Sequence, residues 1–171
     1  FKAEITFGST TIQSDHGGTS QNAFVAKLSA TDGTAAWVRT ISSALGGYSS
    51  VYRPTFNGDG DVIVGGERCA SEWLYCSAFV QLLDGDTGAT IWVKDFGPQM
   101  TRAVGTVAKD DMYYVSGGFS GDMSVDNLTL TAETAMDAVT IVLDSDAVAQ
   151  WAVMIAGQAD DGIQWRESNF V

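Results

Sequence analysis

The sequence predicts an all-β protein, and two observations carry this expectation. Glycine is abundant, at 19 of 171 residues, whereas proline occurs only 2 times. Short runs of valine, isoleucine, threonine and aromatic residues are separated by clusters of glycine, aspartate, asparagine and serine, a pattern typical of strands joined by tight turns. Helical periodicity is weak throughout. We therefore expect short strands along the whole chain.

The chain also repeats itself. Three segments align as a strand, an acidic turn and a second strand: 22–37, 77–92 and 137–151. Each ends in a tryptophan, and Trp37, Trp92 and Trp151 recur at intervals of about 55 to 60 residues. The third copy is one turn residue shorter than the other two. The strands are thus kept while the turn varies.

A second unit lies between these copies, at 51–66 and again at 103–118, where two strands flank a polar turn. Together the two units give four short strands per repeat, which is one blade of a β-propeller. The sequence therefore predicts about three four-stranded blades in one region, 1–171. The expected repeats are 1–45, 46–100 and 101–159, with the start of a further one at 160–171. Because closed propellers have about four to eight blades, we expect a partial propeller or an open segment of a larger one.

Stacked blades hide apolar residues on both faces of each sheet, so strict alternation is not required. The residues expected in this core are Phe24, Val25, Leu28, Phe79, Val80, Leu82, Val139, Ile141 and Leu143. The glycine pairs at 65–66 and 117–118 are expected where backbones approach closely.

The residues carry a family resemblance that spans nearly the whole chain. The run Ala-Phe-Val-Ala-Lys-Leu from Ala23, the Asp-Gly and Trp after it, and Gly-Asp-Gly-Asp-Val-Ile-Val-Gly-Gly from Gly58 resemble the SBBP-type β-propeller repeat of extracellular and surface proteins. The segment 83–92 is similar to the tryptophan-docking motif of PQQ-like propellers. That resemblance implies that Trp37, Trp92 and Trp151 pack against a turn of the next blade. The third copy departs from the motif, because Ala147 and Val148 stand where Thr-Gly is expected.

Charge and hydropathy limit the partners. Acidic residues outnumber basic ones 21 to 9, for a net charge of −12, which repels a phosphate backbone, so no nucleic-acid partner is expected. No apolar run approaches the roughly 20 residues of a membrane helix. The chain begins without a leader pattern, so any targeting peptide is expected to have been removed or to lie outside it. With the resemblance, this favours a secreted or cell-surface location.

Two short motifs suggest covalent modification. Cys69 and Cys76 are close enough along the chain for a hairpin to bring them together, which favours a local disulfide over free buried thiols. They lack the spacing of a zinc site. Asn127 begins an Asn-Leu-Thr sequon and is a candidate glycosylation site in a secreted protein.

The sequence offers one weak metal site and no catalytic motif. Asn57, Asp59 and Asp61 alternate on a glycine-rich segment and could converge on Ca²⁺, but the bidentate glutamate of an EF-hand is absent, and a hairpin turn fits better. There is no nucleophile elbow and no phosphate-binding loop. His16 fits a plain loop position. We expect no cofactor and no enzymatic activity.

The expected function is that of a non-catalytic extracellular structural, adhesive or assembly module that binds protein or glycan partners. Its loops at 9–21, 68–76 and 121–135 would form the binding surface, with Trp73 and Tyr75 either contacting the partner or packing on the blade edge. The alternatives are a carbohydrate-binding propeller and a fragment of a PQQ-like quinoprotein dehydrogenase, although the adjacent-cysteine disulfide of that family is missing. Open sheet edges imply that the chain continues into, or associates with, further blades.

Overall fold

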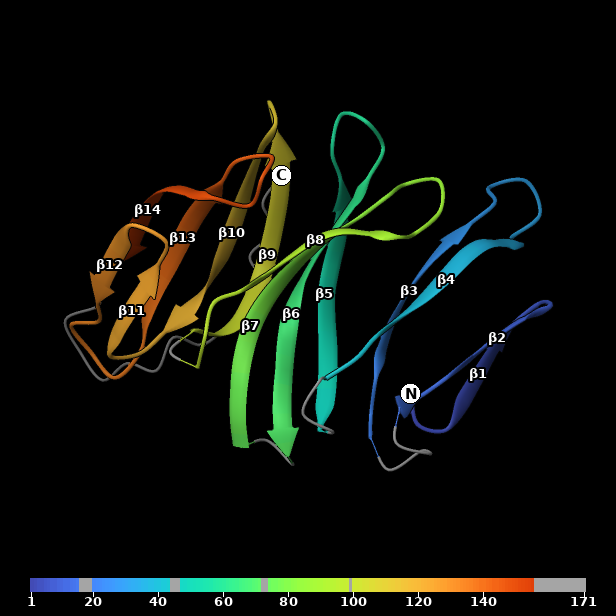
Figure 1. The fold of residues 1–171 in the computed structure, drawn as a ribbon, viewed down its shortest axis with the longest axis horizontal. Coiled ribbons are helices and arrows are strands. Elements are labelled where there is room, and N and C mark those ends of the chain that lie inside the picture. The colour runs from blue at the N-terminus through green and yellow to red at the C-terminus, as the bar shows by residue number, and fades with distance from the viewer. Residues whose placement is uncertain (16–19, 44–46, 72–73, 99, 156–171) are drawn as a thin grey trace.

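A computed structural model describes residues 1–15, 20–43, 47–71, 74–98 and 100–155 (Figure 1). These residues form β-strands joined by turns and no α-helix, which confirms the all-β prediction. Within the described ranges, no helix is long and apolar enough to cross a membrane. The predicted start of a further repeat at 160–171, His16 and Trp73 lie outside the described residues.

The N-terminal part consists of two hairpins. Strands β1 (Glu4–Phe7) and β2 (Thr10–Gln13) pair with each other, and β3 (Ala23–Leu28) pairs with β4 (Ala35–Ile41). Phe24 of β3 packs against the rings of Phe1 and Phe7, which ties the two hairpins together.

The central part is a four-stranded antiparallel meander. It consists of β5 (Tyr48–Phe56), β6 (Val62–Ser71), β7 (Leu74–Leu83) and β8 (Thr90–Asp95), paired in that order. Strands β6 and β7 are long, and beyond the end of β8 they continue as a paired ribbon in which Cys69 lies opposite Cys76. Tyr48 of β5 pairs with Cys69 on the other side of β6.

The C-terminal part is a second four-stranded antiparallel sheet. Its strands are β9 (Met100–Lys109), β10 (Met112–Phe119), β13 (Asp137–Leu143) and β14 (Ala149–Ile155), and β10 lies between β9 and β13. A separate hairpin of β11 (Asp122–Val125) and β12 (Leu128–Thr131) connects β10 to β13. This hairpin occupies the place in the chain order that the β6–β7 ribbon takes in the central sheet.

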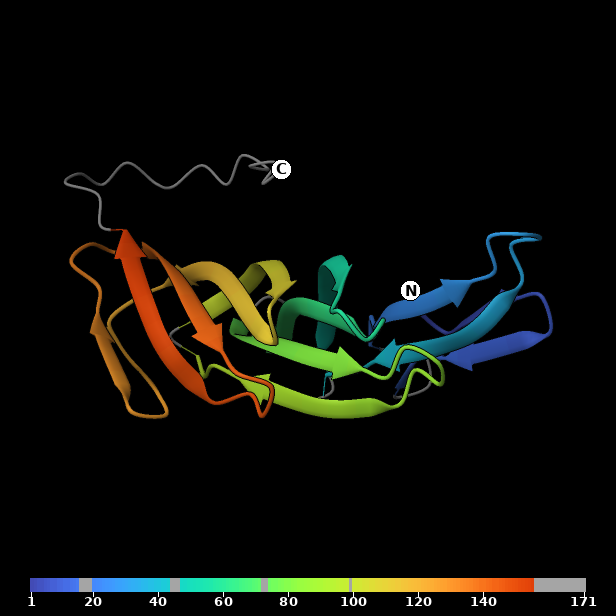
Figure 2. The same cartoon turned by 90° about the horizontal axis from the view of Figure 1, so that it is seen from above.

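The three parts follow one another in a row, with β1–β4 at one end and β11–β14 at the other (Figures 1 and 2). Two apolar clusters fill the spaces between them. The smaller one joins Val25, Trp37 and Ile41 of the first part to Val64 and Phe79 of the central sheet. The larger one joins the opposite face of the central sheet to the C-terminal sheet; it includes Ile63, Val80, Leu82, Val115, Phe119, Ile141 and Leu143. The two middle strands of the central sheet, β6 and β7, are therefore covered on both faces.

The same irregularity occurs in all three parts. The strand register shifts between Lys27 and Leu28 in β3, and again at the junctions Leu82/Leu83 in β7 and Val142/Leu143 in β13. As a result each tryptophan pairs with the residue just before the shift: Trp37 with Lys27, Trp92 with Leu82, and Trp151 with Val142. The three segments aligned by sequence thus adopt equivalent strand pairs.

The core prediction is correct at most positions and wrong at Leu28. Leu83 and Leu143 are 1% and 0% exposed, whereas Leu28, at the equivalent site in β3, is 53% exposed. Leu83 and Leu143 belong to the apolar clusters that lie between neighbouring parts, whereas Leu28 belongs to neither cluster. Burial at this position therefore depends on a neighbouring sheet.

Close backbone approach explains the glycine pairs. A Cβ atom on Gly66 would collide with the carbonyl oxygen of Ser50, and one on Gly117 would collide with the carbonyl oxygen of Arg102. The neighbouring strands lie too near for any side chain there. The sheets themselves are small and open, and the described residues form no closed propeller.

Candidate functional site

The clearest specialised contact is the one between Trp37 and the turn joining β7 to β8. Trp37 is 5% exposed, and its indole Nε1 donates a hydrogen bond to the Gly85 carbonyl oxygen at 3.0 Å. Its ring lies against Gly88, where a Cβ atom would come within 2.6 Å of the ring. Gly88 also has a φ of +69°, a conformation that side chains other than glycine's disfavour. The turn is thus shaped to receive the indole.

Two cations from the same hairpin hold the turn from outside. Lys27 donates to the Gly85 carbonyl oxygen at 2.7 Å. Arg39 donates to the carbonyl oxygens of Gly88 and Thr87, at 3.1 and 2.6 Å. The cations thus give hydrogen-bond donors to the carbonyl oxygens of Thr87 and Gly88, and a second donor to the Gly85 carbonyl beside the indole.

The turn is also braced internally. The Asp84 carboxylate accepts hydrogen bonds from the backbone N–H groups of Asp86 and Thr87 and from the Thr87 hydroxyl. The Thr87 hydroxyl and then its N–H are the main reasons why the pKa of Asp84 lies below its usual value. Asp84 is therefore a turn-capping residue.

The candidate Ca²⁺ ligands serve the adjoining turn between β5 and β6. The Asn57 Oδ1 atom accepts from the N–H groups of Asp59 and Asp61, at 3.1 and 2.8 Å. Asp61 accepts from the Gly85 N–H at 2.9 Å, which fastens this turn to the one that receives Trp37. The Asn57 Oδ1 atom and the Asp61 carboxylate thus accept from backbone donors, as expected of a hairpin turn, and Asp59 contributes its N–H.

The other two tryptophans are placed differently. Trp92 on β8 packs on the larger apolar cluster and meets the Tyr113 ring edge-on at 5.3 Å, yet its buried Nε1 has no hydrogen-bond partner among the described residues. Trp151 on β14 is 44% exposed and contacts the edge of the Tyr114 ring. Of the three, only Trp37 is seated against a turn of the next sheet in the described part of the chain.

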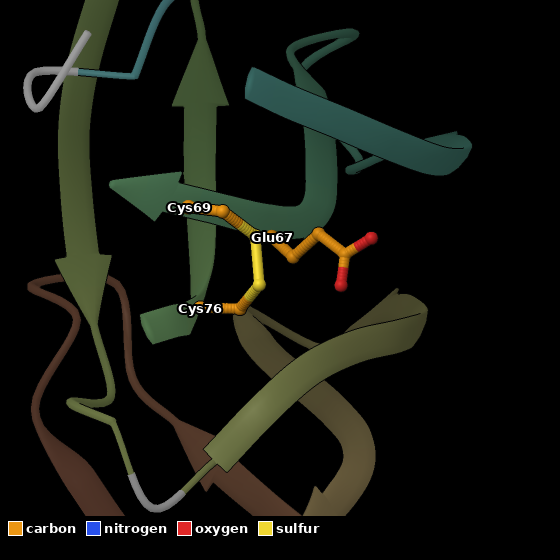
Figure 3. A group of neighbouring side chains, drawn as sticks. All are labelled: Glu67, Cys69 and Cys76. Atoms are coloured by element: carbon orange, nitrogen blue, oxygen red, sulfur yellow. A yellow bond between two sulfur atoms is a disulfide. The ribbon is translucent and has the colours of Figure 1, made fainter. Parts of the chain in front are cut away.

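The predicted disulfide is present. Cys69 and Cys76 are directly opposed on β6 and β7, and their sulfur atoms are bonded (Figure 3). Cys69 is fully buried. Glu67 lies two residues before Cys69 on the same side of β6, and its carboxylate comes close to both sulfur atoms. Because the sulfurs are bonded to each other, they are not available as thiolate ligands for a metal.

Glu67 is the buried centre of a polar cluster. The Tyr52 hydroxyl donates to one of its carboxylate oxygens at 2.8 Å, and the Arg102 Nε donates to the other at 3.0 Å. Burial, followed by the hydrogen bond and charge of Glu67, raises the pKa of Tyr52 to about 12. Since Arg102 belongs to β9 and the other two to β5 and β6, the cluster ties the central sheet to the C-terminal one.

Sequence reasoning missed this cluster. The signal was a glutamate directly after the Gly65-Gly66 pair, in a strand that is apolar up to that point and has Arg68 next to it. Buried acids are rare unless they are paired, which would have prompted a search for a cationic partner. The partner itself, Arg102, is distant in sequence, and only the packing of β9 on β6 identifies it.

Two further predicted residues can be placed. Asn127 lies in the exposed two-residue turn between β11 and β12. Tyr75 lies on β7, next to the disulfide, but the structure describes its backbone only.

No protein-family model matches this sequence, and no curated protein is significantly similar to it.

Proposed function

We propose that this chain is a non-catalytic structural and assembly module of a secreted or cell-surface protein, built as a partial or open β-propeller. The observation that carries the proposal is the row of sheets packed face to face, in which Trp37 and Trp92 each face the part that follows. Such stacks are stabilised mainly by contacts between neighbours and leave a face to be covered at each end. A row of this kind is suited to joining further sheets.

The propeller assignment draws support from the strand order. The central sheet is a four-stranded antiparallel meander, and the C-terminal sheet has the same order once the β11–β12 hairpin is set aside. The equivalent register shifts in β3, β7 and β13 agree with a repeated blade of the SBBP type. About three blades would then lie along the chain.

The extracellular assignment draws support from the disulfide. Disulfides form and persist chiefly in oxidising compartments, and Cys69–Cys76 accounts for both cysteines of the chain. Asn127 lies in an exposed turn, where an oligosaccharide would meet no steric obstacle from the sheets. A net charge of −12 suits solubility outside the cell.

The polar clusters favour a structural role over catalysis. The carboxylate of Glu67 is held by Tyr52 and Arg102, and Asp61 and Asp84 cap turns. Each of these acids already accepts hydrogen bonds that fix the fold, so removing a proton from a substrate would break a structural contact. Partners are expected to bind at the loops and exposed faces instead, through protein or glycan contacts.

Two binding experiments test the proposal. The purified chain is applied to a glycan array and, separately, titrated with pyrroloquinoline quinone and Ca²⁺ while absorbance is recorded. We expect no retained quinone and no oxidation of alcohols. Retention of the quinone with turnover would replace the proposal with a quinoprotein function. Glycan binding that is lost in Trp73→Ala would identify the partner as a carbohydrate. Ile91→Ala, which removes an exposed apolar side chain of β8, is the control variant.

A further inference from the structure

The last described strand carries an exposed apolar row. Trp151, Val153 and Ile155 alternate along β14 on one face and are 44%, 51% and 67% exposed. In the first part of the chain, the equivalent row Trp37, Arg39 and Ile41 faces the central sheet, and Trp37 and Ile41 are buried there. The face of β14 thus has the geometry of a sheet-to-sheet contact without a described sheet upon it.

The other end of the row carries the matching turn. Between β3 and β4, the Ser29 N–H donates to the Thr34 carbonyl and the Gly33 N–H donates to the Ser29 carbonyl, at 2.8 and 2.9 Å. The turn that receives Trp37 has the same two bonds, from Asp84 to Ala89 and from Gly88 to Asp84, both at 2.8 Å.

The glycines of these two turns also correspond. Gly33 and Gly88 have φ values of +71° and +69°. Gly88 is covered by Trp37, but a Cβ atom on Gly33 would meet nothing within 4 Å among the described residues. Leu28, which immediately precedes this turn, is 53% exposed. The turn at 29–34 is therefore a tryptophan-accepting turn that is vacant in the described structure.

Polar residues at the internal contact are replaced by small or apolar ones at both ends. At the contact between the central and C-terminal sheets, Lys94 lies two residues after Trp92 and binds Asp126 at 2.6 Å. Two residues after Trp151 the chain has Val153 instead. Asp126 opens the β11–β12 turn with a φ of +51°, and Gly8 opens the equivalent β1–β2 turn with a φ of +59°. Bringing the two ends together therefore buries neither an unpaired lysine nor an unpaired aspartate at this position.

From these matching ends we propose that copies of this chain associate head to tail, with Trp151 of one copy seated on the Ser29–Thr34 turn of the next. The partner is a second copy, because the chain itself carries both the exposed tryptophan and the vacant turn. The contact is heterologous, so each copy can accept one neighbour and donate to another. This inference rests on the proposed function and names the partner at the ends of the stack.

Salt should strengthen the association. Each copy carries a net charge of −12, so two copies repel each other at low ionic strength, while the proposed contact itself is apolar. Raising sodium chloride from 0.15 to 1 M screens the repulsion and favours apolar burial. A contact held by ion pairs would weaken under the same change.

Sedimentation velocity of the whole chain at rising concentration tests the proposal with two variants. Trp151→Ala removes the exposed indole, and Gly33→Asn adds a side chain in the vacant turn while asparagine tolerates the positive φ. We expect each substitution to raise the dissociation constant about 30-fold or more, as for loss of a central aromatic anchor. Phe56→Ala, which removes another exposed aromatic residue distant from both ends, is the control and should associate normally.

Mixing the two variants separates this contact from any other. Trp151→Ala keeps an intact turn and Gly33→Asn keeps an intact Trp151, so an equimolar mixture should form dimers and nothing larger. Unaltered association of both variants would overturn the head-to-tail contact while leaving an assembly function in place. A wild-type chain that stays monomeric in 1 M salt would also overturn it, and the glycan and quinone experiments would then judge the proposed function separately.

Discussion

The two contacts between sheets differ in how the tryptophan of each is held. At the first, Trp37 is bonded to the Gly85 carbonyl and packs on Gly88. At the second, Trp92 is packed among apolar side chains but its Nε1 has no described partner. The same residue type at the same register position thus makes a complete contact in one place and an incomplete one in the other.

The length of the receiving turn explains the difference. The first turn closes with a bond from the Asp84 N–H to the Ala89 carbonyl, five residues on, whereas the third-copy turn closes from Asp144 to Val148, four residues on. The shorter turn has Ala147, with a φ of +62°, near the place of Gly88. It offers neither a glycine surface nor a carbonyl to the indole.

A surface ion pair takes over at the second contact. Lys94 binds the Asp126 carboxylate, which also accepts the Ala149 N–H at 2.7 Å. Asp126 thereby joins β8, the β11–β12 turn and the start of β14. A fixed tryptophan position therefore does not fix the contact, because the opposing turn decides which groups are available.

The largest effect is expected at the first contact. Gly88→Val should lower the free energy of unfolding by about 3 kcal/mol or more, because it combines an unfavourable positive φ with a collision against Trp37. Gly33→Val has the same φ cost in open space and should lose only about 1 to 2 kcal/mol. Urea unfolding measures both, and equal losses would show that the indole contact contributes little.

A smaller effect is expected in the ribbon that distinguishes the central sheet from the C-terminal one. Replacing both Cys69 and Cys76 by serine should cost about 2 kcal/mol, the amount expected when a short loop is no longer closed covalently. Unfolding of the wild-type chain in reducing agent should give the same midpoint as the double variant. If the midpoint of the double variant equals that of the oxidised wild-type chain, the strand pairing alone holds the ribbon.

A gain of stability is expected in the shorter turn. Ala147→Gly should raise the free energy of unfolding by about 0.5 kcal/mol, because glycine relieves the positive φ but has greater freedom in the unfolded chain. Ala89→Gly, at a position outside the positive-φ region, should instead lower it by a similar amount. A loss in both variants would indicate that the Ala147 methyl group contributes to packing.

The smallest effect concerns acid. The hydrogen bond from Lys94, followed by the Ala149 N–H, holds the pKa of Asp126 below its ordinary value of 3.8. The unfolded state therefore binds the proton more tightly, so the stabilisation is present above about pH 4 and is lost as pH falls through the folded pKa. Asp126→Asn should flatten the stability profile between pH 5 and 2 by a fraction of a kcal/mol. A profile unchanged in slope would argue against this pair as the link at the second contact.

Much of the local structure follows from residue type and spacing. Asn57, Gly58 and Gly60 predict the β5–β6 turn, and the Cys69–Cys76 spacing predicts a bond across a ribbon, because both depend on residues near one another in the chain. Spacing favoured a hairpin turn over a Ca²⁺ site at Asn57, Asp59 and Asp61, but it could not predict that the Asp61 carboxylate binds the Gly85 N–H of another turn.

By itself, then, the sequence determined an all-β chain with strands, turns and a local disulfide in the expected places, since propensity and short-range contacts are encoded along the chain. The tertiary structure decided that Trp37 is seated, that Trp92 is packed with no hydrogen-bond partner for its Nε1 among the described residues, and that Trp151 is exposed. It also decided that Leu28 is exposed and that Glu67 meets Arg102. Each of these outcomes depends on which sheet lies opposite, and that is a property of packing between distant segments.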